Sequence, residues 1–128
     1  MDTDQFPVAL SRYDTELRFV RQNPAMEHIV GIGGEDRVGR GLSAALTGPG
    51  NAAWEARMRR ALETGQAEEG HLLQGRTRAD PDHDHFFAVS ASPLGRIVGL
   101  CATALDVTEQ HRGRERLALL NEASTRSC

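Results

Sequence analysis

The start of the chain shows the alternation of apolar and polar residues that favours short strands. Residues 8–13 alternate loosely, and residues 17–21 do so again. The segment between them, 14–16, is polar and typical of a turn. The pattern therefore predicts a β-hairpin.

A short helix is expected after this hairpin. Asn23 and Pro24 form a helix-start signal, because asparagine is a good N-cap and proline suits the first helical position. Gly31 is a natural end for this helix. The following glycine-rich stretch predicts loops, with short helical turns only around residues 35–38 and 42–46.

The clearest helix covers residues 51–64. Trp54, Met58 and Leu62 recur within it at helical spacing and share one face. Gly65 supplies the stop signal. The apolar face predicts packing against the rest of the protein.

The second half of the chain is rich in β-forming residues. Three strands are expected, over residues 70–77, 86–91 and 97–105. The polar segment 79–84 predicts a turn between the first two, and 94–96 predicts another before the last. The predicted chain order is thus two strands, helices, then three strands.

The last predicted strand is apolar on both faces. Leu100, Ala102 and Ala104 face one side, whereas Cys101 and Leu105 face the other. A strand of this kind is typical of a position covered on both sides. One cover is a helical layer. The exit helix, the N-terminal segment and a second copy of the chain are all candidates for the other.

Composition and charge limit the classes of function that the chain can have. With 128 residues, 39% hydrophobic and 26% charged, the chain resembles one soluble globular domain. A net charge of −3 disfavours nucleic-acid binding. No apolar run has membrane-spanning length and the start lacks a signal-peptide pattern, so we expect a cytoplasmic protein without a membrane partner. Cys101 and Cys128 form no disulfide framework.

The order of the predicted elements resembles that of PAS domains. The motifs that carry the resemblance are Asn23-Pro24-Ala25, Gly31 and the segments 35–40, 62–65, 91–94 and 106–109. The resemblance covers residues 8–109, and leaves 1–7 as an N-terminal extension and 110–128 as the start of a linker or signalling helix. It implies an α+β fold with a five-stranded antiparallel sheet of order 2-1-5-4-3, helices on one face and a C-terminal exit helix.

The tail carries a second resemblance. Residues 108–124 look like the connector that follows the PAS domain in actinobacterial multidomain regulators. The resemblance implies a sensory module, itself no enzyme, cut from a longer chain with a GAF domain and a metal-dependent serine/threonine phosphatase of the sporulation/stress-sigma-factor type. No catalytic motif is present in the sequence. The alternative is a small-molecule receptor with an apolar pocket, coupled to a histidine kinase or another effector.

PAS domains often hold a ligand between the sheet and the long helix. The resemblance places nine residues there: Trp54, Met58, Leu62, Phe87, Val89, Ala91, Leu100, Ala102 and Ala104. Such a lining suits a small apolar ligand. The same spacing is typical of a packed core, so both interpretations stay open.

Flavin and haem are not expected. A flavin photosensor of the light-oxygen-voltage type needs a reactive cysteine after a Gly-Arg step, but residues 39–42 read Gly-Arg-Gly-Leu and Cys101 lies on another element. Ala104 and Phe87 stand where flavin-binding relatives carry amide side chains. Haem needs an axial ligand, usually a histidine on the long helix, and residues 51–64 contain none.

Residues 80–85, Asp-Pro-Asp-His-Asp-His, are the one cluster with metal-ligand chemistry in the sequence. In an extended chain His83 and His85 point to the same side and could contribute to a surface zinc site. The residue types are more typical of a polar hairpin turn, and further ligands are missing. No metal site is therefore assigned.

The step from strand to helix at residues 106–108 is the predicted output joint. Asp106 and Thr108 are both good N-caps, and Glu109 is favoured near the positive end of the exit helix. A shift of the sheet would alter the first helical turn. The exit helix has a poor heptad seam, so we expect weak helicity when it is isolated. We expect it to become ordered when the chain forms a homodimer.

Overall fold

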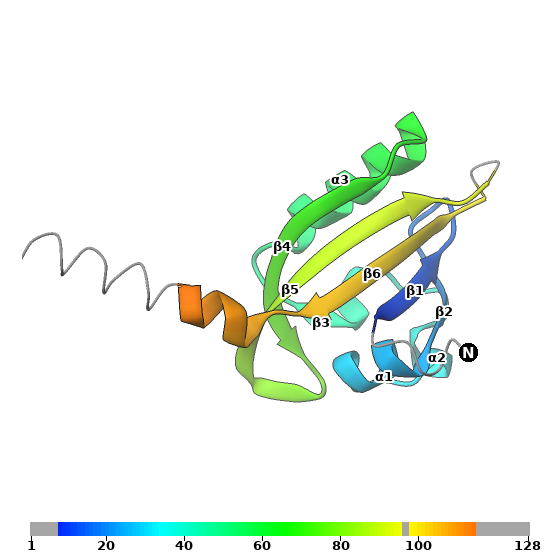
Figure 1. Cartoon of the computed structure of the whole chain (residues 1–128). Helices are drawn as coiled ribbons and strands as arrows, with labels where there is room; N and C mark the ends of the chain where they lie inside the picture. Colours follow the sequence, from blue (N-terminus) through cyan, green and yellow to red (C-terminus); the bar gives the residue numbers. More distant parts are fainter. Residues whose placement is uncertain (1–7, 96–97, 115–128) are drawn as a thin grey trace, which may run out of the picture.

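The computed structural model describes residues 8–95 and 98–114. One antiparallel sheet of six strands, in the order β2-β1-β6-β5-β4-β3, forms the body of this region (Figure 1). The strands are β1 (Ala9–Tyr13), β2 (Phe19–Gln22), β3 (Leu46–Thr47), β4 (Glu68–Thr77), β5 (Asp80–Pro93) and β6 (Leu100–Asp106). The predicted α+β class and the order 2-1-5-4-3 are confirmed, with β3 as an additional short edge strand.

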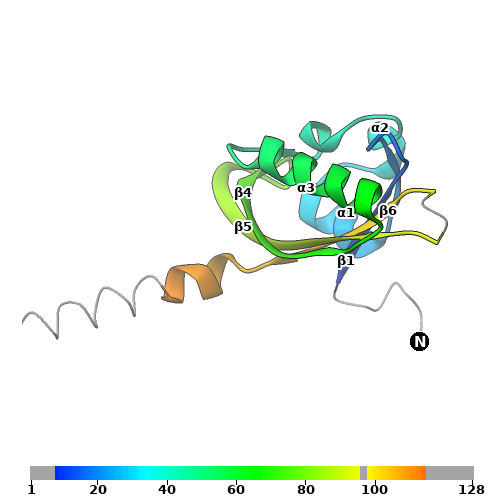
Figure 2. The same cartoon turned by 90° about the horizontal axis from the view of Figure 1, so that it is seen from above.

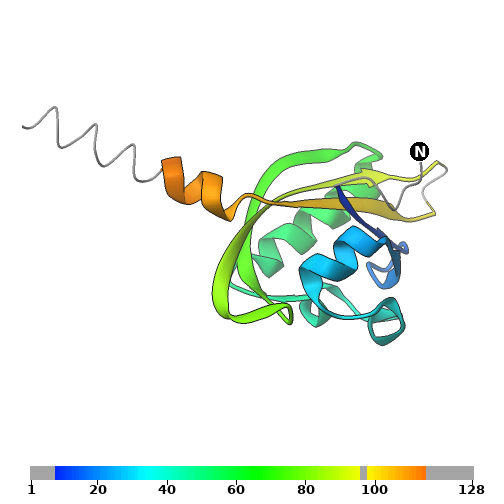
Figure 3. The ribbon, with the colours of Figure 1, turned by 60° about the horizontal axis from the view of Figure 1, so that its bottom comes forward.

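The helices lie on one side of the curved sheet (Figure 2). They are α1 (Pro24–Val30), α2 (Gly34–Arg37), the 3₁₀ turn η2 (Leu42–Ala44) and α3 (Asn51–Thr64). The chain is helical again over residues 108–114. This exit helix leaves the end of β6 and extends away from the sheet (Figure 3).

Both ends of α1 follow the sequence prediction. The Asn23 side chain accepts a hydrogen bond from the Met26 N–H at 3.0 Å. Gly31 ends the helix in the left-handed conformation with φ 69°, and its N–H donates to the Glu27 carbonyl. A Cβ at Gly31 would lie 2.4 Å from the Ala79 nitrogen. This glycine therefore lets α1 approach the β4–β5 turn closely.

The long helix α3 packs its apolar face on the sheet. Trp54, Met58 and Ala61 are at most 2% exposed, and they belong to one core cluster with Phe19 and Leu100. Gly65 closes the helix with φ 72°. The predicted helix boundaries are confirmed.

The prediction of a polar turn over residues 79–84 is wrong. The turn consists of Arg78 and Ala79 alone, and β5 begins at Asp80. The partner strand β4 satisfies the polar groups, since Asp84 accepts hydrogen bonds from Arg76 at 2.8 Å and Gln74 at 3.1 Å. Cross-strand pairing thus overrides the weak strand preference of aspartate and proline.

Several other predicted boundaries shift. The strand expected over 70–77 begins at Glu68, and the strand expected over 86–91 ends at Pro93. The strand expected over 97–105 begins at Leu100, and the helical turn expected over 42–46 is shorter, because Leu46 pairs with Thr77 in the sheet. The strand expected over 17–21 begins at Phe19. Leu17 belongs to the preceding turn with φ 62°. The Asp14 carboxylate holds that turn by accepting the Glu16 and Arg18 N–H groups.

The outer face of β6 is only partly covered. Leu105 is 51% exposed and Cys101 is half-buried. The described turns of the exit helix run beyond the end of β6 (Figure 3) and contact the sheet through the stacked rings of His111 and Phe86, but they leave Leu105 half exposed and so do not supply a complete second covering layer. None of the helices in residues 8–95 and 98–114 is long and apolar enough to cross a membrane.

Candidate functional site

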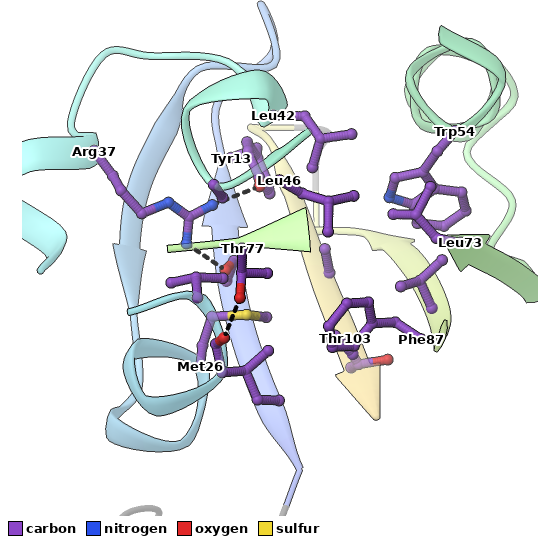
Figure 4. A pocket seen from close by; sticks show the side chains of 17 residues that line it. Tyr13, Met26, Arg37, Leu42, Leu46, Trp54, Leu73, Thr77, Phe87 and Thr103 are labelled. Atoms are coloured by element: carbon purple, nitrogen blue, oxygen red, sulfur yellow. Dashed lines mark hydrogen bonds between the residues drawn. The ribbon is translucent and has the colours of Figure 1, made fainter. Parts of the chain in front are cut away.

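A cavity of about 50 Å³ lies between the sheet and the helices (Figure 4). Five of the nine predicted pocket residues line it: Trp54, Phe87, Val89, Ala102 and Ala104. The other four do not. Met58, Ala91 and Leu100 belong to the adjoining core, and Leu62 packs against that core.

The cavity extends further toward β1, α1 and η2 than the sequence indicated. The additional lining residues are Ser11, Tyr13, Met26, Ile29, Val30, Arg37, Leu42, Ala45, Leu46, Leu73, Thr77 and Thr103. Most come from short elements that are too brief to show a helical or strand period. For the residues of α1, α2, η2 and β3 the sequence had no periodic signal, whereas Ser11, Tyr13, Leu73, Thr77 and Thr103 lie on predicted strands but were not assigned to the pocket.

Arg37 forms a polar corner of this cavity. Its guanidinium donates to the Tyr13 hydroxyl at 2.9 Å, to Gln22 Oε1 at 2.6 Å and to Ser11 Oγ at 3.3 Å. Its carbon CZ lies 4.0 Å from the centroid of the Phe19 ring. Burial lowers the pKa of Arg37 and raises that of Tyr13. The site is therefore apolar with one cationic end.

The cavity is small for a ligand site. An engineered cavity of about 150 Å³ holds benzene, whereas typical cofactor and drug pockets reach several hundred Å³. In this conformation the site fits a few non-hydrogen atoms. Cys101 is not among its lining residues. The expectation that neither flavin nor haem binds stays a prediction.

The output joint is held by side-chain hydrogen bonds. Asp106 Oδ1 accepts the Thr108 N–H at 3.0 Å and the Thr108 hydroxyl at 2.5 Å. The Thr108 hydroxyl in turn accepts the Phe86 N–H at 3.0 Å. Asp106 thus caps the first turn, whereas Thr108 fastens that turn to β5. Glu109 lies in the same turn and is exposed.

A histidine that the sequence placed only in a metal hypothesis belongs to this joint. His85 Nδ1 lies 2.8 Å from Asp106 Oδ2, and His85 Nε2 lies 2.8 Å from Asp80 Oδ2. Both ring nitrogens face carboxylates, an arrangement that a doubly protonated imidazolium satisfies. The His85–Asp106 pair is 21 residues apart in sequence. Only the pairing of β5 with β6 brings the two together.

Electrostatics at the joint follow from these bonds. The Asp80 hydrogen bond raises the pKa of His85 against the opposing effect of burial, and the Asp106 bond adds to it. Hydrogen bonds from His85 and His83 lower the pKa of Asp80 to about 2. Burial acts to raise the pKa of Asp106, but bonds from Thr108 and His85 outweigh it and leave that pKa lowered.

The two metal candidates turn toward a carboxylate. His83 Nδ1 lies 2.9 Å from Asp80 Oδ1, and His85 contacts the other oxygen of the same group. Within the described residues, no group of three or more His, Cys, Asp or Glu side chains is arranged to hold a metal ion. The cluster is a hydrogen-bonded network in this structure.

The sequence and the fold were compared with those of known proteins. Residues 3–112 match the sequence family described as the PAS fold. No curated protein sequence matches the chain. An RNA-binding light-oxygen-voltage receptor superposes with a TM-score of 0.76 at 23% identity, covering 93% of this chain and 35% of the receptor.

Two further solved structures are similar. The PAS domain of a protein from Colwellia psychrerythraea has a TM-score of 0.70 and 18% identity, over 83% of this chain and 91% of that one. VqmA from Vibrio cholerae has a TM-score of 0.67 and 24% identity, over 84% of this chain and 49% of VqmA. The chain thus spans about a third of the receptor and half of VqmA. These likenesses concern the fold, and the family match over residues 3–112 shows that the chain belongs to the PAS family of sensory domains.

Proposed function

We propose that this PAS domain relays ligand binding or a protein contact through the Asp106-Val107-Thr108 joint to an output domain. The observation that carries the proposal is that cavity and joint share a direct contact. Phe87 lines the cavity, and its ring stacks on His85 with centroids 6.0 Å apart and planes 17° apart.

The contact continues from His85 into the exit helix. His85 bonds to Asp106, and Asp106 accepts the first-turn N–H of Thr108. Ala104 supports a second route, since it lines the cavity and lies two residues before Asp106 on the same strand. A ligand that displaces Phe87 or bends β6 would therefore move the capping carboxylate.

The exit helix is also tied to β5 by its backbone. The Val107 N–H donates to the Phe86 carbonyl at 2.8 Å, and the Phe86 and His111 rings stack with centroids 4.1 Å apart. These contacts dock the first turns of the exit helix against β5, and the proposed relay requires a second arrangement in which they are released. A coupling claim requires such an element, whose equilibrium both sites bias.

Xenon offers a test, because it enters small apolar cavities without polar contacts. We expect NMR signals of Trp54 and Val89 to shift on xenon binding, together with the Thr108 and His111 amides. The matched control is Phe87→Leu, which keeps an apolar wall but removes the stacking on His85. In that variant the cavity signals should still respond, while the joint responds less. Joint amides that stay unchanged in the wild type at saturating xenon would contradict the relay.

We further propose a cytoplasmic parent protein in which a GAF domain and a metal-dependent serine/threonine phosphatase follow the PAS domain. The support is the resemblance of residues 108–124 to the connector in such regulators; 115–124 lie outside the described residues. The protein encoded by the complete gene should hydrolyse a phosphoserine peptide in the presence of Mn²⁺. ATP-dependent autophosphorylation on histidine, without hydrolysis, would favour the alternative output.

We also propose that the chain forms a homodimer through the outer face of the sheet. Leu72, Ala88 and Leu105 are cross-strand neighbours there, and Leu72 and Leu105 are 45% and 51% exposed. Apolar rows of this kind suit burial against a second copy. Leu105→Glu should shift the mass in analytical ultracentrifugation toward monomer. Val38→Glu, at an exposed apolar residue near α2, serves as the control. A wild-type monomer at high concentration would refute the dimer.

A further inference from the structure

The arginine at the polar corner of the cavity has no counter-ion among the described residues. Arg37 is 1% exposed. Its three hydrogen-bond acceptors, on Tyr13, Gln22 and Ser11, are neutral groups. No ion pair within residues 8–95 and 98–114 includes it. The positive charge is thus buried without a negative partner from this part of the chain.

The guanidinium also has N–H groups that donate to no acceptor among the described residues. It carries five N–H groups, and three acceptors receive bonds from its two terminal nitrogens. The Arg37 Nε atom is buried with no hydrogen-bond partner. The Phe19 ring beside it attracts a cation but offers no conventional acceptor.

Such an arrangement is costly for a protein core. An unpaired buried charge is strongly disfavoured, and arginine does not escape the cost by losing its proton at neutral pH. An apolar side chain of similar volume often serves stability as well or better. A cation held at this position is therefore best explained by a ligand of opposite sign.

The shape of the cavity limits that ligand. Arg37 and Tyr13 lie at one side, and Trp54 and Leu73 lie at the other (Figure 4). The volume of about 50 Å³ admits only a few non-hydrogen atoms. A single guanidinium matches a single negative charge, and its planar fork fits the two oxygens of a carboxylate.

We propose that the cavity binds a short-chain monocarboxylate, with its carboxylate on the Arg37 guanidinium and its hydrocarbon end toward Trp54. This inference rests on the proposed ligand-sensing function and names the class of ligand. No residue other than Arg37 is required to supply charge.

Propionate is a suitable probe, with propionamide as its neutral counterpart and chloride as a simple anion at equal ionic strength. In thermal unfolding of the whole chain, propionate should raise Tm in a saturable way, whereas propionamide and chloride should not. A ligand that binds only the folded state stabilises that state. Arg37→Met should weaken propionate binding about tenfold or more, the effect of losing one charge-assisted hydrogen bond. Arg40→Met removes an exposed arginine nearby and should leave binding unchanged.

Equal stabilisation by propionamide or chloride would overturn the assignment, as would undiminished propionate binding in Arg37→Met. If Arg37→Met does not fold, Arg37→Lys takes its place. In that case the change in Trp54 fluorescence of the wild type on adding propionate is compared with the change on adding propionamide. Equal changes would also overturn the assignment. Binding of xenon without propionate would reject the carboxylate class while leaving the proposed sensing function in place. If neither xenon nor propionate binds, both the carboxylate assignment and the proposed sensing function are rejected.

Discussion

Replacing Thr108 by valine tests whether one hydroxyl fastens the exit helix to the sheet. Valine has nearly the same shape but cannot hydrogen-bond. The Phe86 N–H loses its acceptor at 3.0 Å, and Asp106 loses a donor at 2.5 Å. Thr108 is 8% exposed, so water cannot easily replace the hydroxyl. An unsatisfied partly buried N–H costs about 1–3 kcal/mol, whereas the more exposed Asp106 recovers a donor from water.

The expected loss for Thr108→Val is about 2 kcal/mol, which corresponds to a fall in Tm of roughly 6–10 °C for a domain of this size. Urea unfolding followed by circular dichroism measures the loss. Thr108→Ser is the control, because it keeps the hydroxyl and loses one methyl group, at about 1 kcal/mol or less. Hydrogen exchange of the Phe86 amide should accelerate in the valine variant alone. Equal stability of the two variants, with Phe86 still protected, would refute the fastening role.

Three further predictions concern the joint, the glycines and the core. Because the pKa of His85 is raised on folding, its stabilising contribution is present below the ordinary value of about 6.5 and is lost as pH rises through the folded pKa. His85→Gln should therefore flatten the fall of the urea midpoint between about pH 6 and 8. The control His28→Gln, at an exposed helix position, should leave that fall unchanged. Parallel pH profiles for the wild type and His85→Gln would argue against a stabilising role of His85. Gly31→Ala should destabilise more than Gly39→Ala in the same assay, because both have positive φ but only Gly31 meets backbone, at Ala79; equal losses would contradict this. Met58→Ala removes a side chain that is 1% exposed and should cost about 2–5 kcal/mol in calorimetry, and a loss below about 1 kcal/mol would mean that the site collapses without a cavity.

Local chemistry explains which elements were predictable. Asn23, Gly31 and Gly65 act through hydrogen bonds and backbone angles within a few residues of themselves. Their effects do not depend on distant parts of the chain. The boundaries of α1 and α3 could therefore be read directly from the residues.

The start of β5 shows where local reading fails. Asp80, Pro81 and Asp82 are turn formers by composition, yet they extend a strand. Their partners, Thr77 and the preceding residues of β4, stabilise the extended form from outside the segment. A preference that depends on a neighbouring strand is not encoded in the segment itself.

The candidate site was predictable to a similar extent. Trp54, Phe87 and Ala102 occupy regular elements whose period identifies an inward face, and all three line the cavity. Arg37 belongs to a four-residue helix with no period, and its charge favours an exposed position by composition. Its burial is a property of the surrounding contacts.

The sequence by itself determined the boundaries of α1 and α3, the order of the elements along the chain and the place where the last strand gives way to the exit helix, because caps and periodicity act over short distances. The order of the strands within the sheet followed from the resemblance to a known family. Tertiary structure alone decided that Arg37 enters the cavity and that His85 joins Asp106 to Asp80. These contacts arise when strands and helices far apart in the chain close around one core. Such closure depends on all of its members at once, and no local pattern carries it.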